Sequence, residues 1–167
     1  MTTRKRPKPA DYFSDWKQRE ALAEAMIPIV GRLYRERSLK VFIYGRSLVS
    51  KSVLEIMKIH RFARQVEQNE LSEFETWPLI EALGRLKLGA GQVDVGHLTM
   101  AYMAGPRETG VTAEAFLRKE LYGLIGSTVK PLDSPRDVVL YGFGRIGRLM
   151  ARLLIEKTGG GDVLRLR

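Results

Sequence analysis

Apolar residues recur every three to four positions over most of the chain between Asp11 and Gly126. This spacing is typical of amphipathic helices, which bury one face and expose the other. Pro28 interrupts the first apolar stripe. Because its ring lacks an N–H and clashes with the carbonyl of Glu24, the sequence predicts a kink or a break near Ile27. The first stripe consists of Phe13, Trp16, Leu22, Met26, Ile29, Val30, Leu33 and Tyr34.

A second stripe follows the β-like run 40–44, which the pattern leaves open as either a strand or a helix extension. A third helix is predicted to open near Thr76, with Pro78 in its first turn, and to continue to Leu86. The second stripe consists of Leu48, Val49, Val53, Ile56, Met57, Ile59, Phe62 and Ala63.

Two shorter helices are predicted next, one from about Asp94 to Met103 and one from an N-cap at Thr112 to Ile125. The following segment, 127–136, holds two prolines and little periodicity, which is typical of a linker. The pattern therefore predicts a mostly α N-terminal extension over 11–126, with a domain boundary behind it.

The pattern changes in the segment 137–167. The run 138–141 is β-branched and apolar, as in a parallel strand covered on both faces. Helical spacing then returns from Ile146 to Leu154, glycines 159–161 end that helix, and 163–167 begins a second strand. Strand, turn, helix and strand in this order indicate the start of an α/β domain.

The turn between the first strand and the helix carries a complete G-x-G-x-x-G motif, in the strand-to-helix context that dinucleotide binding requires. Gly142 would permit the tight turn, Gly144 would let the backbone approach a pyrophosphate, and Gly147 would let helix and strand pack closely. The phosphates would meet the amides of Arg145 and Ile146 at the positive end of the helix. The alternative is a glycine-rich turn without a ligand.

An acidic residue that binds the ribose hydroxyls usually lies about 20 residues after the first glycine. Asp162 has this spacing, but it precedes the second strand, whereas ligands bind beyond the carboxyl ends of strands. We therefore interpret Asp162 as a loop residue and expect the ribose-binding acid after residue 167.

Positive charge is concentrated at the two ends of the chain. The net charge is +9, yet residues 11–136 hold 18 bases against 16 acids. Residues 1–10 hold four bases and no acid, and 137–167 hold six bases and three acids. We expect 1–10 to be a disordered basic tail, and we do not expect nucleic acid as a partner, because the long middle segment is nearly neutral.

The chain contains no cysteine among its 167 residues, which excludes disulfides, cysteine metal ligands and a cysteine nucleophile within it. No metal site is predicted. No apolar run approaches the length of a membrane helix, and the N-terminus lacks the apolar core of a secretory signal. We expect a cytoplasmic protein without a membrane partner.

The segment 137–149 resembles the start of glyceraldehyde-3-phosphate dehydrogenase, whose cofactor domain opens with the phrase Gly-Phe-Gly-Arg-Ile-Gly-Arg. The preceding 136 residues resemble the helical extension of a longer bacterial branch of that family, including the phrase at 43–48 and the later one at 156–161. The resemblance implies a Rossmann (doubly wound) NAD-binding domain that begins in this chain and is incomplete in it. It also implies that NAD is bound by Gly142, Phe143, Gly144, Arg145, Ile146 and Gly147.

The family oxidises and phosphorylates glyceraldehyde 3-phosphate to 1,3-bisphosphoglycerate in glycolysis and gluconeogenesis, and the resemblance implies a homo-oligomeric parent. A cysteine and a histidine perform that chemistry. Because the chain lacks the cysteine, and the family's histidine falls outside the matched part, we assign no catalytic residue and expect this fragment alone to be inactive. NAD and NADP cannot be distinguished without the acid after the second strand.

Three further features resemble functional sites but are interpreted as structural. The segment 45–52 nearly spells a P-loop, but Ser50 replaces the second glycine and no strand ending in a magnesium-binding Asp is expected after it. We interpret it as a helix start with Ser47 or Ser50 as the N-cap. His60 is expected on a solvated basic helix face, and His97 near a helix start.

A different reading of 11–126 is a helical interaction or regulatory module that binds protein or RNA.

Overall fold

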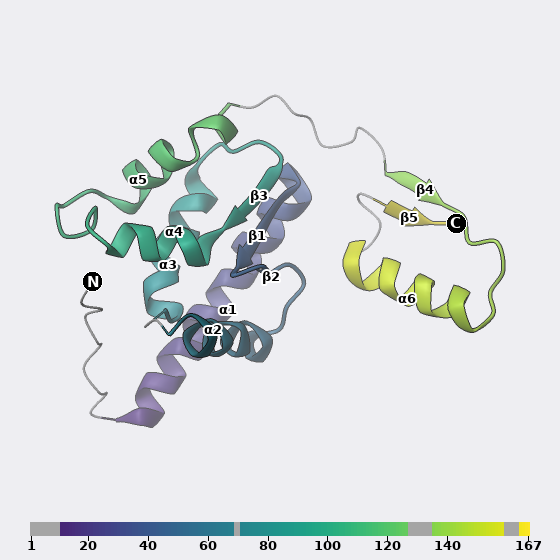
Figure 1. Cartoon of the computed structure of the whole chain (residues 1–167), viewed down its shortest axis with the longest axis horizontal. Helices are drawn as coiled ribbons and strands as arrows, with labels where there is room; N and C mark the ends of the chain where they lie inside the picture. The colour runs from purple at the N-terminus through teal and green to yellow at the C-terminus, as the bar shows by residue number, and fades with distance from the viewer. Residues whose placement is uncertain (1–10, 69–70, 127–134, 159–163) are drawn as a thin grey trace. The chain divides into compact units, whose positions relative to one another are not determined.

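The computed structural model describes residues 11–68, 71–126, 135–158 and 164–167 (Figure 1). The chain divides into two compact units, unit 1 at residues 1–129 and unit 2 at residues 130–167. The predicted basic tail, most of the predicted linker and the glycines 159–161 lie outside the described residues.

Unit 1 begins with a long helix, α1 (Tyr12–Arg37). The Asp11 carboxylate accepts hydrogen bonds from the amides of Phe13 and Ser14, at 3.0 and 3.3 Å, which satisfies two donors of the first turn. Of the kink or break predicted near Ile27, the break is wrong, since the helix continues through Pro28. Met26 and Val30, on either side of the proline, are fully buried, and packing of this face outweighs the lost backbone bond.

A small mixed sheet follows, with strand order β2-β1-β3. β1 (Leu39–Ile43) turns through two residues with positive φ, Tyr44 and Gly45, into the antiparallel β2 (Arg46–Ser47). β3 (Gly91–Asp94) pairs with β1 in parallel. The predicted run 40–44 is therefore a strand as far as Ile43, with Tyr44 in the turn that follows. The other two strands did not appear in the sequence pattern.

Two helices connect β1 to β3, and both begin with a capping box. α2 (Val53–Glu67) is capped by Ser52 with Glu55, so the prediction of Ser47 or Ser50 as its N-cap is wrong. α3 (Glu73–Arg85) is preceded by Ser72 with Glu75, three residues before the predicted start at Thr76. The predicted start was late because Ser72 and Glu75 supply the start signal, while Pro78 lies in the second turn.

The last helices of unit 1 start where the sequence predicted. α4 (Val95–Met103) is capped by Asp94, and α5 (Ala113–Glu120) by Thr112. α5 ends five residues before the predicted Ile125, because the chain turns into a short 3-10 helix, η1 (Tyr122–Leu124).

The core of unit 1 lies between the sheet and the helices, with α3 contacting α1, α4 and α5 (Figure 1). Two members of the first predicted stripe, Phe13 and Trp16, are 64% and 39% exposed, so the stripe reaches the core only farther along α1. The largest fully buried side chains of the unit 1 core are Met26, Leu33, Leu39, Ile43, Leu48, Ile56, Leu71, Leu79, Ile80, Leu83, Leu86 and Leu117.

Unit 2 consists of β4 (Arg136–Val138), α6 (Arg145–Thr158) and β5 (Leu164–Leu166), and the two strands pair in parallel. The parallel pairing agrees with the sequence pattern. The expected burial on both faces is wrong for the described residues, because Val139 and Tyr141 lie after the short strand and are exposed. Across the described part of both units, no helix combines the length and apolarity needed to span a bilayer.

Candidate cofactor site

The glycine turn, residues 142–147, follows β4 and includes the first three residues of α6. Because β4 and β5 are parallel, their carboxyl ends lie at the same edge of the sheet, and the turn follows that edge. The amide of Arg167 donates to the carbonyl of Val138 at 3.0 Å, so the pairing continues to the last residue of the chain. Ligands of α/β units bind at this edge.

Two of the three glycines are required by the backbone itself. Gly142 has a φ of +101°, a region that side-chain-bearing residues rarely adopt. A Cβ at Gly147 would lie 2.2 Å from the carbonyl oxygen of Gly142, so the first turn of α6 rests directly on the turn before it. The first glycine thus makes the bend, and the third permits the helix to approach the turn.

At the middle glycine, neither a positive φ nor a close atom requires the absence of a side chain. A Cβ at Gly144 would meet no atom within 4 Å. Its backbone therefore faces open space beside the start of the helix.

The first amides of α6 are suited to an anion. In an α-helix the first amides lack an acceptor within the helix, and here they include Arg145 and Ile146. The first bond back to the turn is from the amide of Arg148 to the carbonyl of Gly144, at 3.0 Å. The first turn holds no acidic residue, so the positive helix end is not neutralised. These features fit a pyrophosphate.

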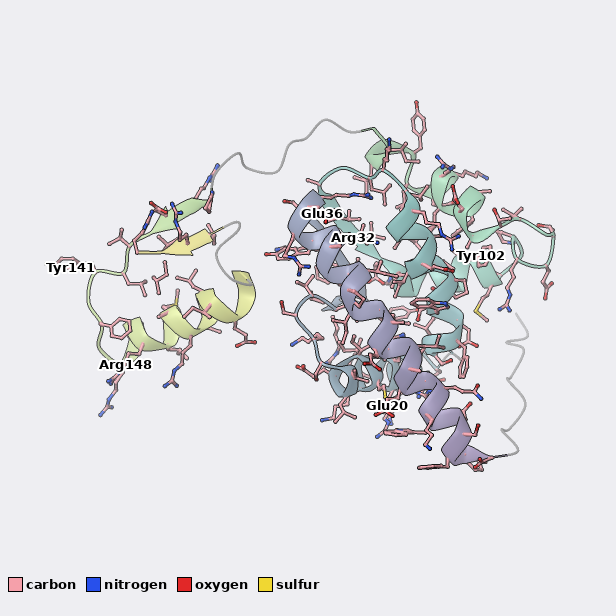
Figure 2. The ribbon with its side chains drawn as sticks, turned by 180° about the vertical axis from the view of Figure 1, so that it is seen from behind. Glu20, Arg32, Glu36, Tyr102, Tyr141 and Arg148 are labelled. Atoms are coloured by element: carbon pink, nitrogen blue, oxygen red, sulfur yellow. The ribbon has the colours of Figure 1, made fainter. Side chains whose placement is uncertain are left out.

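Exposed side chains flank the glycine turn. Phe143 is 65% exposed and Ile146 78% exposed. Figure 2 shows Arg148 extending away from the ribbon beside the start of α6, and Tyr141 extending from the segment before the turn. All six residues predicted to bind the cofactor thus lie together in this one turn.

The structure places Asp137 in β4, where sequence reasoning had assigned it no role. Its carboxylate accepts hydrogen bonds from Arg165 at 2.9 Å and Arg167 at 3.2 Å. The Arg165 guanidinium, with that of Arg167, lowers the pKa of Asp137. The pairs join the two parallel strands. Asp162 lies outside the described residues, in front of β5.

The P-loop-like segment of unit 1, residues 45–52, makes its contacts with neighbouring residues of the same chain. Ser50, in place of the second glycine, has a φ of +56°. The Lys51 ammonium lies 3.1 Å from a Glu55 carboxylate oxygen, and Ser52 caps α2. These contacts agree with the interpretation of the segment as a helix start.

One short strand after this segment, β3, does end at an aspartate, Asp94, beside β1. The Asp94 carboxylate accepts bonds from four backbone amides, at 3.0 to 3.2 Å. Burial raises the pKa of Asp94, but the bonds from Gly45, Tyr44 and His97 outweigh burial and hold it below its usual value. Asp94 thus fastens the β1–β2 turn to α4. His97 is the third residue of α4, near the helix start as predicted.

His60 is fully buried, so the expectation of a solvated basic face is wrong. Its Nδ1 lies 2.9 Å from the carbonyl oxygen of Ile56, to which it donates, and its Nε2 lies 2.8 Å from the hydroxyl of Thr76. Its Nδ1 also lies 3.5 Å from Glu73. The charged neighbours at 58, 61 and 64 had indicated an exposed face, whereas α3 covers the ring.

Acid is expected to destabilise unit 1 through His60. Burial lowers the pKa of His60, although Glu73 opposes this; the nearby cations Arg19 and Arg64 act with burial. The unfolded chain therefore takes up a proton at higher pH than the folded chain. Stability is fully present above about pH 6.5 and falls as pH drops below that value, by at most about 1.4 kcal/mol per pH unit for one proton.

Urea unfolding between pH 7.5 and 5.5 measures this dependence. His60→Gln keeps a donor and an acceptor but cannot titrate, so its unfolding free energy should change less with pH over this range. Equal pH dependence in the two proteins would show that His60 is not the responsible group.

Metal binding has no candidate among the residues that the structure describes, where no group of three His, Asp or Glu side chains is placed to hold an ion.

The chain resembles a known protein over most of its length. A glyceraldehyde-3-phosphate dehydrogenase-like protein of Pseudomonas aeruginosa (strain UCBPP-PA14) is 49% identical to it over 144 residues. The matched residues are 85% of this chain and 31% of the relative, so this chain spans about a third of the relative's length. No protein-family model matches the chain.

Proposed function

We propose that this chain is the N-terminal part of an NAD-dependent glyceraldehyde-3-phosphate dehydrogenase, and that β4, the glycine turn and α6 open its Rossmann domain. The 49% identity to the Pseudomonas protein supports the family relationship. The observation that carries the cofactor proposal is the contrast within the turn, where a Cβ position is open at Gly144 and closed at Gly147.

Each residue of the turn has a role in this proposal. The amides of Arg145 and Ile146 donate to the pyrophosphate, and the positive end of α6 favours its charge. Gly144 allows the backbone to approach, while Gly142 and Gly147 hold the turn against the helix. The exposed side chains of Phe143 and Ile146 border the same opening.

The parent enzyme would oxidise glyceraldehyde 3-phosphate and phosphorylate it to 1,3-bisphosphoglycerate, as a cytoplasmic homo-oligomer. Bound NAD supplies the acceptor for the substrate's hydride. The contribution of this chain is to bind and orient the dinucleotide. It has no cysteine to act as nucleophile, so the reaction depends on residues that this chain does not hold.

Isothermal titration of the 167-residue chain with NAD tests the binding role. Gly144→Ala should weaken binding by roughly tenfold or more, the effect of losing one charge-assisted hydrogen bond. The fold should be unaffected, because the new Cβ meets no atom within 4 Å. Gly123→Ala is the matched control, since Gly123 also has open space around its Cβ position but lies in η1 of unit 1.

Equal affinities of the Gly144→Ala and Gly123→Ala variants, or no saturable heat with NAD, would contradict the cofactor role. The reading frame beyond Arg167 provides a separate test of the family. It should continue the second strand to an acidic residue and later encode a cysteine and a histidine. A stop codon directly after Arg167 would contradict the proposed parent enzyme.

A further inference from the structure

The first turns of α1 are joined to α3 by a buried ion pair. The Arg19 Nε donates to Oε2 of Glu73, at the start of α3, at 2.6 Å. Before Arg19, Phe13 is 64% and Trp16 39% exposed, whereas Ala23 behind it is fully buried. Figure 1 and Figure 2 show this end of α1 extending beyond α2 and α3. Packing of the helix therefore begins near Arg19.

Glu73 has a second group beside it that can carry positive charge. Its other oxygen, Oε1, is buried without a hydrogen-bond partner among the described residues, and Nδ1 of His60 lies 3.5 Å away. The His60 ring is fully buried, while the Arg19 side chain is 18% exposed. Two other acids of this junction are engaged: Asp15 lies 4.0 Å from Arg19, and Glu75 forms the capping box of α3. A protonated His60 would thus supply the partner that Oε1 lacks, and Arg19 is the cation that can move into water.

The hydrogen bonds of His60 in the folded chain suit the neutral ring. Its Nδ1 donates to the carbonyl of Ile56 at 2.9 Å, and its Nε2 accepts from the hydroxyl of Thr76 at 2.8 Å. A second ring proton can be placed only if the Thr76 hydroxyl turns away, toward the carbonyl of Ser72 at 3.2 Å. Protonation therefore requires a rearrangement at the junction of α1, α2 and α3.

The charged groups around His60 act on its protonation from all three helices. Burial, the largest cause, lowers the pKa of His60, and Arg64 of α2 and Arg19 of α1 act in the same direction, while Glu73 of α3 opposes them. Movement of Arg19 into water takes one of these cations away and leaves Glu73 in place. It therefore favours the protonated ring.

We propose that the Arg19–Glu73 pair beside His60 is an acid-sensitive switch for the first turns of α1. When these turns separate from α2 and α3, Arg19 moves into water and His60 takes up a proton beside Glu73. The proton stabilises the separated form, because the charged ring replaces the guanidinium as the partner of Glu73. The opening is local: residues 12–22 separate while the core of unit 1 stays folded.

The size of the effect follows from the uptake of one proton. The separated form binds it with the ordinary histidine pKa of about 6.5, and the closed form does not. The ratio of separated to closed molecules should therefore rise about tenfold between pH 7.5 and 5.5.

Amide hydrogen exchange of the full chain tests the proposal. Protection factors, which are corrected for the intrinsic effect of pH on exchange, should fall about tenfold between pH 7.5 and 5.5 for the amides of residues 16–22. His60→Gln should remove this dependence, because glutamine keeps a donor and an acceptor but cannot titrate. His97→Gln is the matched control: this second histidine has a 68% exposed side chain, and its replacement should leave the dependence as it is.

Urea separates the local opening from unfolding of the whole unit. Protection of residues 16–22 should be lower than that of the α3 core and nearly independent of low urea concentrations, because a local opening exposes little surface. The amides of Leu79 and Leu83, whose side chains are fully buried in the core, should instead lose protection as urea is added.

A second variant tests the ion pair without altering the histidine. Arg19→Gln removes the charge that contacts Glu73, and it should lower the protection of residues 16–22 at pH 7.5 by about tenfold or more, the effect of losing a hydrogen bond between charged groups. Arg85→Gln removes a cation from an exposed pair with Glu81 and should leave that protection unchanged.

Three results would overturn the proposal. They are equal pH dependence of residues 16–22 in the unaltered chain and in His60→Gln, unchanged protection of these residues in Arg19→Gln, and protection that responds to urea as strongly as that of the α3 core. If His60→Gln does not fold, the pH dependence of the unaltered chain and the comparison of Arg19→Gln with Arg85→Gln decide the question.

Discussion

Gly147→Ala is expected to disrupt unit 2. The new Cβ would lie 2.2 Å from the carbonyl oxygen of Gly142 and 3.1 Å from its carbon. Both are backbone atoms of the turn, so neither moves aside as a flexible side chain would, and α6 must separate from the turn that precedes it. Ala has the higher helix propensity, by about 1 kcal/mol, yet this gain is small against such an overlap.

Amide hydrogen exchange measures the loss most directly. Amides of α6 and of the paired strands β4 and β5 should exchange much faster in Gly147→Ala, while those of the unit 1 core stay protected. Gly144→Ala makes the same chemical change three residues earlier, where the new Cβ has open space, and should leave exchange as it is. Unchanged protection of α6 in Gly147→Ala would show that the helix does not rest on the turn.

Glu73→Ala is expected to destabilise unit 1 by about 3–5 kcal/mol, the cost of removing one partner of a buried ion pair. The Glu73 side chain is fully buried, and its Oε2 accepts the Arg19 bond at 2.6 Å. Without it, the guanidinium of Arg19, only 18% exposed, keeps Asp15 at 4.0 Å as its neighbouring acid. A loss of this size is a large part of the stability of a typical domain.

Urea unfolding gives the free energy, and two variants locate its cause. Glu73→Gln keeps the shape and one acceptor oxygen, so its loss should be smaller than that of Glu73→Ala. Glu81→Ala removes a carboxylate from an exposed pair with Arg85 and should change stability by less than about 1 kcal/mol. If Glu73→Ala and Glu81→Ala cost the same, the buried pair contributes nothing beyond an ordinary surface pair.

The other oxygen of Glu73 sharpens this expectation. Glu73 Oε1 is buried and has no hydrogen-bond partner among the described residues, and the His60 ring lies 3.5 Å from it. The carboxylate is therefore only partly satisfied. Replacing Arg19 and Glu73 together by Met and Leu should recover most of the loss, because apolar residues of similar volume need no partners.

Helices whose signals lie within a few residues could be predicted from the sequence. α4 begins at its predicted start near Asp94, and α5 at its predicted cap, Thr112, because each of these residues caps its helix by bonding to amides two or three residues ahead. The glycine turn is also a local motif, and its six residues were found together for that reason. Even so, α1 continues through Pro28, since the packing of its buried face is not a local property.

Features that depend on distant partners could not be predicted. β3 is only four residues long and becomes a strand by pairing with β1, about 50 residues earlier in the chain. The charged neighbours of His60 indicated a solvated face, but α3 brings Thr76 and Glu73 over its ring. Conversely, Phe13 and Trp16 follow the spacing of a core stripe and are exposed, because no element packs that end of α1 in the described structure.

By itself, the sequence determined the helical nature of the first unit, the strand–turn–helix order of the second and the absence of a cysteine nucleophile. Only the tertiary structure decided which Cβ position of the turn is closed by packing, at Gly147, and which are open, at Gly142 and Gly144. The reason is physical: a glycine in a motif shows that a Cβ is missing, and the atoms brought near it by folding determine what its absence permits.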